Sequence, residues 1–462
     1  MHHTEIKARR RERSVLMNAA KQSGSPEDSA DAMSAAEHWK ITILAGLANY
    51  IDGGSIVAGS AALALWVSAF HLSPTFVGVI GAFSANAISA GVGALIGGWL
   101  CDRLGRKKIY QYDMLFYAFG MLWLIFAVRA WMIVVGFVLV GLAVGADIPA
   151  SWSLIAEMAP QRERGKHSGV AQVLWYLGPV VVLLLSLVLA PLGVLGIRIV
   201  FGQLAVIAVV LTLLRRRMKE SSLWQESKRE SGAADAATAK KESAWSGASL
   251  QQLFTGRALK SMLFLISMYG LWNLWAGTNG FFFPYILRTV GAQTQAGSVG
   301  LQAAGYTVAM LSIGFVFMRL SDRVSQRVMM AIAGLLQVSG MVLLAIFPLT
   351  TAVALAYAIL LQFGGGFGQQ SFFQLWSAEL FPTAVRGTAQ GIMFAVVRIT
   401  LGLWSFFVPI LTATGFTTLA WILTGFVAAS SLIGILGAPH NEGKSLKEIE
   451  AREQASGTEQ GG

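Results

Sequence analysis

Apolar stretches long enough to cross a membrane follow one another along most of the chain, separated by short polar segments. A spanning helix needs roughly 20 predominantly apolar residues. The pattern predicts twelve such helices, at about 41–69, 76–100, 112–128, 131–155, 169–190, 199–214, 260–288, 299–318, 329–347, 352–376, 389–412 and 417–437. Gly and Pro residues within spans are tolerated where neighbouring helices satisfy the backbone. We therefore expect an all-α polytopic membrane protein.

Longer polar segments divide these helices into two groups of six. We expect a tail at 1–40, a first six-helix bundle at 41–214, a loop between the bundles at 215–259, a second six-helix bundle at 260–437 and a tail at 438–462. The connecting loop is rich in Lys, Arg, Glu, Ser and Ala. A flexible linker and short surface helices both fit this composition, because Ala, Lys and Glu favour helix.

Two charged motifs occur once in each half of the chain. An E-x-x-P-x-x-x-R-G string begins at Glu157 and again at Glu379, and an Asp-Arg pair begins at Asp102 and again at Asp322. The spacing between the two copies is nearly the same for both motifs, which defines a long-period internal repeat. In so apolar a chain, the repeat predicts two related membrane halves, an architecture used by secondary transporters.

The basic residues are placed mainly on one side of the predicted membrane. The net charge of +11 could suggest a nucleic-acid partner. Apart from Arg129, Arg198, Arg288 and Arg398, however, every Lys and Arg lies in a tail or at an even-numbered loop. Because cytoplasmic loops are enriched in Lys and Arg, we expect both termini to be cytoplasmic, and we expect no nucleic-acid partner.

Composition agrees with a membrane protein and offers little catalytic chemistry. Hydrophobic residues make up 55% of the chain and charged residues 13%, whereas soluble domains have about 25% charged residues. The chain has no H-x-x-x-H pair and no G-x-S-x-G string. We therefore expect no enzyme activity, metal or other cofactor. The chain also lacks an N-x-S/T glycosylation site, which favours a bacterial inner or plasma membrane.

A compact charged loop follows the second span. Its G-x-x-x-D-R-x-G-R-K string contains Gly98, Asp102, Arg103, Gly105, Arg106 and Lys107. An acid favours the positive N-terminus of a helix and bases favour the negative C-terminus, so the loop could clamp neighbouring helix ends. Charge that only sets topology is the alternative. The string resembles the signature loop of the major facilitator superfamily. That resemblance implies two six-helix halves, which this loop holds together in the outward-facing state.

The remaining repeated residues complete a set of candidate gates. The second copy of the signature loop keeps Asp322 and Arg323 but lacks both glycines. The other repeated motif supplies Glu157 with Arg164, and Glu379 with Arg386. Salt bridges between the halves could close one side and open during rocking. We expect them to be surface-exposed, and such pairs contribute only about 0–1 kcal/mol each. Helix-end charges without a gating role are the alternative.

Two further segments resemble the sugar porters within that superfamily. Residues 219–222 resemble their P-E-S-P-R string without its prolines, and residues 439–449 resemble P-E-T-K-G-R-S-L-E-E-I. The resemblance implies a carrier of a small hydrophilic solute. It does not fix the solute, because this branch also includes carriers of polyols, aromatic acids and other organic anions.

Three charged residues lie well inside predicted spans, namely Asp52, Asp147 and Arg398. A charge at the centre of a span costs roughly 2.5–3.5 kcal/mol on insertion scales, so each is a functional candidate. The segment around Asp52 resembles the G-Y-D-T-G segment of sugar porters, which implies that this carboxylate carries the coupled proton. The Arg that partners it in family symporters is missing, and Phe137 stands there. Asp147 could share the proton role, bind a substrate group, or form only a packing hydrogen bond.

Arg398 stands where sugar porters carry an aromatic residue that faces the substrate. Its guanidinium keeps its proton and must find a partner. That partner could be Asp52, Asp147 or Gln374, or an anionic substrate held by a bidentate clamp. Snorkelling towards the membrane surface is the other alternative.

The spans also carry polar and aromatic residues that could contact a solute. Amides bind hydroxyl groups through paired donor and acceptor bonds, and indole faces pack on apolar sugar faces. The candidate substrate-binding residues are Gln172, Asn273, Trp275, Asn279, Gln369, Gln374 and Arg398. Gln369 enters this set because the repeat pairs it with Asp147. For the tryptophans, lipid or core contact is the simpler alternative.

We expect a monomeric secondary active transporter that moves a sugar, polyol or organic acid by alternating access, coupled to protons by symport. Its partners would be the solute, protons and the lipid bilayer. The alternatives are an organic-anion transporter that uses Arg398, and a proton-independent facilitator or exporter on the same fold. A membrane sensor would need a signalling domain that the loop and tails do not supply.

Overall fold

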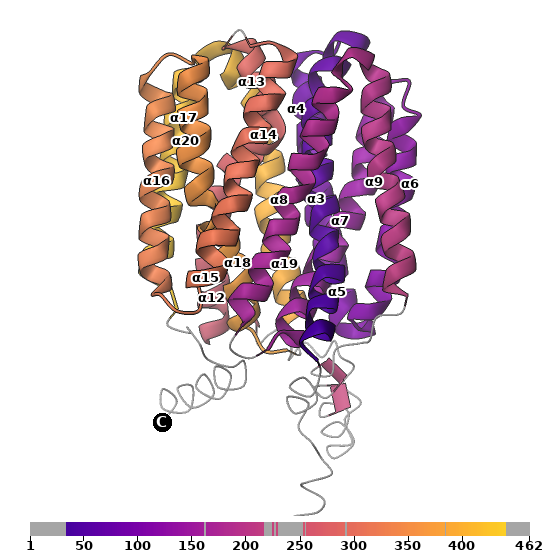
Figure 1. The fold of residues 1–462 in the computed structure, drawn as a ribbon, viewed down its shortest axis with the longest axis vertical. Coiled ribbons are helices and arrows are strands. Elements are labelled where there is room, and N and C mark those ends of the chain that lie inside the picture. The colour runs from indigo at the N-terminus through magenta and orange to yellow at the C-terminus, as the bar shows by residue number, and fades with distance from the viewer. Residues whose placement is uncertain are drawn as a thin grey trace, which may run out of the picture.

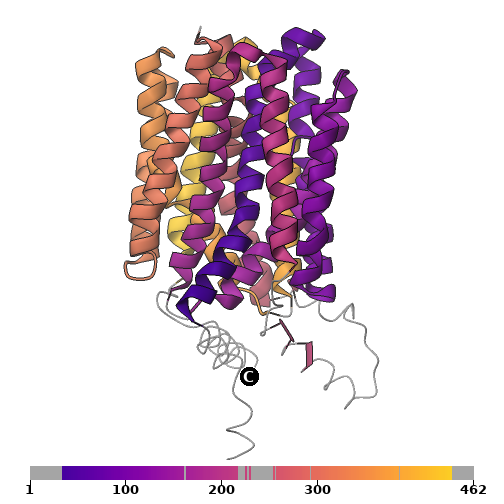
Figure 2. The same cartoon turned by 45° about the vertical axis from the view of Figure 1, so that its right-hand side comes forward.

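The computed structural model describes residues 34–160, 163–216, 224–225, 228–229, 253–254, 256–291, 293–383 and 385–439, and these form an all-helical bundle (Figure 1). The helices run along the long axis of the molecule, and they keep this direction in the turned view (Figure 2). The expected all-α class is therefore confirmed. Most of the two predicted tails and of the loop 215–259 lies outside the described residues, as do residues 219–222 and 440–449.

The described helices fall into the two predicted groups. The first half contains α3 (Ala35–Phe70), α4 (Pro74–Ala82), α5 (Ile88–Leu104), α6 (Arg106–Ile125), α7 (Ala130–Met158), α8 (Arg164–Val188), η1 (Ala190–Leu192) and α9 (Val194–Arg215). The second half contains α12 (Gly256–Gly277), η2 (Thr278–Phe282), α13 (Phe283–Thr289), α14 (Gln295–Ser312), η3 (Ile313–Phe317), α15 (Met318–Leu320), α16 (Gln326–Ile346), α17 (Thr351–Gly366), α18 (Gln369–Glu379), α19 (Arg386–Ser405) and α20 (Val408–Gly437).

Each of the twelve predicted spans coincides with helix, although several spans are interrupted. Among the described residues, 9 helices are long and apolar enough to cross a membrane by length and composition. The second span is broken between α4 and α5, and the tenth between α17 and α18. The π-helical turns η2 and η3 interrupt the seventh and eighth spans. Such breaks are tolerated where the freed backbone groups lie inside the protein.

Two predicted helix boundaries were wrong, and local signals explain both. The first helix begins at Ala35 because Ser34 and Glu37 form a capping box, each side chain bonding to the other's backbone N–H. The predicted span 389–412 ends early, since α19 stops at Ser405 and α20 starts at Val408 with Pro409 in its first turn. Proline is favoured there because the first helical N–H groups need no intrahelical partner.

Glycines allow α5 and α7 to pack closely within the first half. Gly93 and Gly97 of α5 lie against the backbone of Leu142 and Ala146 in α7, and Gly145 of α7 lies against the backbone of Ala90. In membranes, small residues spaced four apart let helix backbones approach closely. This contact fixes α7, which carries Asp147, against α5, which carries the signature loop.

The two halves meet along α3, α8 and α5 on one side and α13, α14, α18 and α19 on the other. We call the lower end of the molecule in Figure 1 the motif end, because the loops with Asp102, Glu157, Asp322 and Glu379 lie there. The other end is called the opposite end. Both described chain ends, Ser34 and Pro439, adjoin the motif end.

We expect Gly145→Val to lower the stability of the bundle. The added side chain would collide with the Ala90 carbonyl, and overpacking of this kind costs about 1–3 kcal/mol. Thermal unfolding of the purified protein in detergent would show the loss. Gly425→Val is the matched control, because no atom lies within 4 Å of a Cβ at Gly425. Equal melting temperatures for the two variants would contradict this account of the α5–α7 contact.

Candidate functional site

Three buried amides join the halves where α8 meets α18. Gln172 of α8 donates through Nε2 to Oε1 of Gln374, and Gln370 donates to Oε1 of Gln172 at 2.8 Å. All three are buried. The structure therefore brings together Gln172 and Gln374, two of the expected substrate-binding residues, and adds Gln370 to them. Amides that bond one another here could exchange those bonds for bonds to solute hydroxyl groups.

Asp52 is buried in α3, and its partner Trp175 lies one turn along α8 from Gln172. Trp175 of α8 donates its indole N–H to Oδ2 of Asp52 at 2.6 Å. The neighbouring Gly53 allows this contact, because a Cβ there would meet the Trp175 carbonyl and the ring of Pro179. Trp175 also contacts the ring of Tyr306 in the second half, with 6.2 Å between the ring centroids. Asp52 is thus one side chain away from the interface between the halves.

Arg398 of α19 has partners that differ from those expected from the sequence. Its Nη1 donates to the carbonyl of Asn86 at 3.3 Å and to Oδ1 of the same residue, and it lies 3.5 Å from Oδ1 of Asn273. The guanidinium carbon lies 4.3 Å from the ring centroid of Phe394. Asn86 can accept these bonds because it lies in the break between α4 and α5, where helix-end carbonyls are free.

Asp52, Asp147 and Gln374 are therefore not the direct partners of Arg398. The charge of Arg398 nonetheless acts electrostatically on Asp52. Arg398 is buried, and its Nε has no hydrogen-bond partner.

Asp147 lies within the first half and pairs with Arg215. The distance from Nη1 of Arg215 to Oδ1 of Asp147 is 2.9 Å, and the distance to Oδ2 of Asp113 is 3.9 Å. Arg215 also donates to the carbonyls of Leu44 and Ala45 in α3. Arg215 was predicted to start the connecting loop. It is instead the last residue of α9 and has no exposed side-chain surface.

The other expected substrate-binding residues occupy two places in the second half. Asn279 accepts a hydrogen bond from the Tyr357 hydroxyl at 3.1 Å, and that hydroxyl accepts one from Trp275 at 2.9 Å. Gln369 points elsewhere. It accepts from Gln337 of α16 at 2.7 Å and donates to Ser431 of α20 at 3.0 Å. These contacts tie helices of the second half together, so Gln369 is separate from the amides at the interface.

At the motif end, acidic side chains of each half bind a helix N-terminus of the other. Asp102 accepts from the backbone N–H groups of Gly387 at 3.2 Å and Thr388 at 2.6 Å, and from the Thr388 hydroxyl at 2.7 Å. Asp322 accepts from the backbone N–H of Gly165 at 3.2 Å. These N–H groups belong to the first turns of α19 and α8, which lack intrahelical partners. The predicted clamp of an acid on a helix N-terminus is present in both copies.

The ion pair at this end is buried and joins the two halves. Nη1 of Arg386 lies 3.2 Å from Oε1 of Glu157, and neither side chain has exposed surface. The expectation of a surface-exposed pair was therefore wrong, because the two groups lie where α7 of the first half packs against α19 of the second. Arg386 also donates to the carbonyl of Phe381, which orients the guanidinium.

The other predicted gate residues lie around these contacts. Gly98 packs against the backbone of Gly387 and Gly391, and Gly105 has the positive φ of 95° that glycine tolerates. The guanidinium of Arg103 lies 5.4 Å from the ring centroid of Trp99. Glu379 is buried, Arg323 is exposed and Lys107 is in the first turn of α6. The side chains of Arg106 and Arg164 lie outside the described residues.

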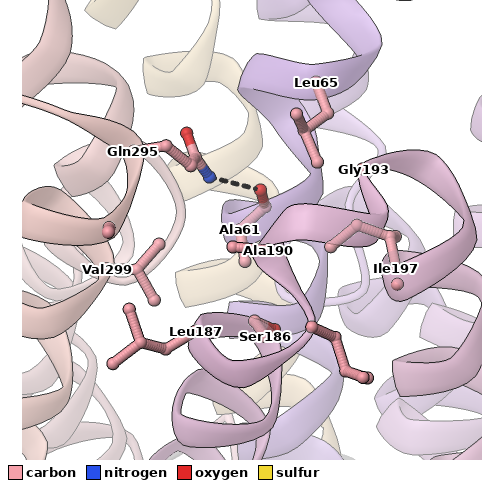
Figure 3. Close-up of a pocket in the computed structure, with 12 residues that line it drawn as sticks. Ala61, Leu65, Ser186, Leu187, Ala190, Gly193, Ile197, Gln295 and Val299 are labelled. Carbon is pink, nitrogen blue, oxygen red and sulfur yellow. Dashed lines mark hydrogen bonds between the residues drawn. The ribbon is translucent and has the colours of Figure 1, made fainter.

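Neutral hydrogen bonds join the halves at the opposite end. Gln295 of α14 donates to the carbonyl of Ala61 in α3 at 3.1 Å, beside a pocket lined by Leu65, Leu187 and Val299 (Figure 3). The Ser60 hydroxyl of α3 donates to Oε1 of Gln302 in α14 at 3.5 Å. Among the described residues, no ion pair joins the halves at this end.

The residues that contact these groups but were not predicted as site residues include Asn86, Asp113, Arg215 and Gln370. Asp113 was at the edge of a predicted span, where an acid is ordinary. Arg215 begins an Arg-Arg-Arg run that is typical of a loop. Asn86 and Gln370 gain their positions from contacts between helices distant in sequence.

Comparisons with known proteins agree with this geometry. The family model described as Major Facilitator Superfamily matches residues 42–404. The chain is 46% identical over 412 residues to the minor myo-inositol transporter IolF of Bacillus subtilis, covering 89% of this chain and 93% of that protein. It is 25% identical to the glucose transporter GlcP of Staphylococcus epidermidis, covering 88% and 94% of the two chains.

The fold is also that of a solved transporter. The structure of the proton:xylose symporter XylE bound to 6-bromo-6-deoxy-D-glucose aligns with a TM-score of 0.73 at 19% sequence identity, covering 91% of this chain and 99% of that one. The breaks in the helices are accommodated within this fold. The chain therefore belongs to the Major Facilitator Superfamily, and it is a sugar-porter-like membrane transporter and not an enzyme.

Proposed function

We propose that this protein is a proton-coupled symporter that imports a small polyol or sugar, with myo-inositol as the first candidate. The observation that carries the proposal is the group of buried, uncharged amides between the halves, together with the buried carboxylate Asp52, whose partner Trp175 is one turn of α8 from Gln172. Neutral amides suit a solute with many hydroxyl groups. The relative IolF is described as a myo-inositol transporter, and XylE as a proton:xylose symporter, which supports the same solute class and coupling.

The solute would reach this group by alternating access. The motif end would be cytoplasmic, since most of the Lys and Arg residues lie at that side. The protein would lie in a bacterial plasma membrane as a monomer. Asp102, Asp322 and the Glu157–Arg386 pair would hold the cytoplasmic side closed, whereas the opposite end would open more readily because no ion pair joins it among the described residues.

Asp52 would carry the coupled proton, and Arg398 would supply its opposing charge. The Arg that family symporters place in the fourth span is Phe137 here, and Arg398 is the cation that acts on Asp52 from the other half. Protonation of Asp52 would weaken this attraction between the halves. Proton binding and the separation of the halves would thereby be linked.

A second candidate function is the transport of an organic anion. Arg398 is buried with an unpartnered Nε, and a guanidinium can bind a carboxylate bidentately. In that case the solute would be an aromatic or sugar acid, and it would displace Asn86 from Arg398. A proton-independent facilitator or exporter on the same fold is distinguished from these by its response to a pH gradient.

The solute class is tested with purified protein in proteoliposomes. With the interior more alkaline, labelled myo-inositol should accumulate above its external concentration, and a protonophore should abolish the accumulation. A panel of hexoses, polyols and carboxylates as competitors defines the class. Competition by carboxylates alone, lost in Arg398→Lys, would favour the organic-anion transporter. Uptake that equilibrates but ignores the pH gradient would favour the facilitator.

We expect Asp52→Asn to abolish proton-driven accumulation while counterflow exchange of labelled solute continues. The amide keeps the shape and the acceptor oxygen for Trp175 but cannot exchange a proton. Asp52→Glu is the matched control and should retain part of the accumulation, since it restores a carboxylate. Undiminished accumulation in Asp52→Asn would remove Asp52 from the coupling mechanism.

The buried ion pair at the motif end predicts a pattern of rescue. Arg386→Gln leaves Glu157 charged and buried without Arg386, a change that typically costs about 3–5 kcal/mol. It should lower both the melting temperature and the transport rate, with little change in solute affinity. The double variant Glu157→Gln/Arg386→Gln should recover most of the stability. If the loss of stability in the double variant equals the sum of the losses in the two single variants, the two residues do not act as a pair.

A further inference from the structure

Three charged side chains of the first half meet near the motif end, away from the interface. Asp113 of α6, Asp147 of α7 and Arg215 of α9 come from three different helices, and all three are buried. Arg215 is 2.9 Å from Asp147 and 3.9 Å from Asp113. We call these residues the N-half cluster.

The charges of the N-half cluster do not balance. Two carboxylates face one guanidinium, which leaves one uncompensated negative charge if both acids are ionised. A buried charge without compensation is strongly unfavourable, and protein groups avoid it by binding or releasing a proton. Oδ1 of Asp113 accepts a hydrogen bond from the backbone N–H of Met114 at 2.6 Å, but its Oδ2 has no hydrogen-bond partner. This orphaned oxygen, on a residue that is only 7% exposed, is the place where a proton would bind.

In the second half, uncharged side chains hold the equivalent helices together. The repeat pairs Asp147 with Gln369, which bonds Gln337 of α16 and Ser431 of α20. These helices are the counterparts of α6 and α9, since they are the third and sixth of their half. Neutral amides and a hydroxyl therefore tie the equivalent helices together. Tying helices together does not by itself require the charges of the N-half cluster.

A proton suits this cluster better than a metal ion. The guanidinium of Arg215 occupies the position next to Asp147 and would repel a metal cation. The charged groups that act on Asp113 are Asp147 and Arg215. On α3, the backbone carbonyls of Leu44 and Ala45 accept hydrogen bonds from Arg215. Asp52, also on α3, interacts electrostatically with Asp147. From α5, the buried Cys101 packs in the same apolar group as Leu44 and Ala45.

Tyr117 shares α6 with Asp113 and has its hydroxyl near Asp52. It is one helical turn after Asp113 on the same face of α6, and it is fully buried with no hydrogen-bond partner for its hydroxyl. The hydroxyl lies near Ser55 and Asp52 of α3. Tyr117 is thus one helical turn from Asp113 along α6, with its hydroxyl near Asp52.

We propose that the N-half cluster is a second proton-binding site of this transporter, at which the Asp113 carboxylate takes up one proton and the charge of the cluster changes from −1 to 0. Release of the proton to the motif end restores the carboxylate. Tyr117 connects this site to Asp52, so the cluster can receive the proton that Asp52 gives up. The link to Asp52 rests on the proposed proton coupling, whereas proton binding by the cluster does not.

Infrared spectroscopy of the purified full-length protein tests the site without any transport. Protonated carboxyl groups absorb apart from carboxylates, so a titration from mildly acidic to alkaline pH counts buried acids that hold a proton. The wild type should show such a signal, and Asp113→Asn should lose one equivalent of it. Asp113→Asn keeps the Asp147–Arg215 pair and the side-chain shape, and we expect it to fold. Asp322→Asn is the control and should leave the buried-acid signal unchanged.

The outcomes separate this proposal from the proposed function. If Asp113→Asn fails to fold, Asp147→Asn should also lose the signal, because one acid then faces one guanidinium. An undiminished signal in both variants would overturn the proposal. Loss of the signal in a protein that transports no polyol would leave the site standing and refute the polyol proposal alone. Tyr117→Phe should keep the signal but slow proton-driven accumulation, and an unchanged rate would refute the connection to Asp52.

Discussion

Backbone polar groups that are kept away from water need hydrogen-bond partners within the protein, and this constraint shapes much of the structure. At the motif end it is met across the halves, where Asp102 and Asp322 accept from the free N–H groups of helix N-termini. Those bonds exist only when the halves are in contact. In the proposed alternating access, the same N–H groups and carboxylates would be hydrated when the motif end opens, so these bonds could form and break as the halves move.

Within each half, buried polar side chains tie the third, fourth and sixth helices together. The second half uses Gln337, Gln369 and Ser431, whereas the first half uses Asp113, Asp147 and Arg215. The two halves thus share a way of packing but differ in charge. In the proposed mechanism, this difference places proton chemistry in the first half, which also carries Asp52. The second half supplies amides, indoles and Arg398, which suit contact with a solute.

At the interface between the halves, polar side chains of the first half contact the amides and the guanidinium of the second. Gln172 of the first half bonds Gln374 and Gln370 of the second, and Asp52 lies beside Trp175, which touches Tyr306. Arg398 reaches from the second half to Asn86 in the first. A solute bound here would replace bonds between the halves with bonds to itself, so binding and rearrangement would compete for the same groups.

The sequence by itself predicted the helical segments, the two related halves and an acid in each signature loop, because hydropathy, the internal repeat and helix-end charges can be found along the chain without knowing which helices touch. Asp52, Gln172 and Gln374 were named from the sequence as candidate site residues, and their roles stay predictions. Only the tertiary structure decided the partners. Glu157 pairs with Arg386, Asp147 with Arg215 and Arg398 with Asn86, since each choice depends on how helices distant in sequence cross, which no local pattern records.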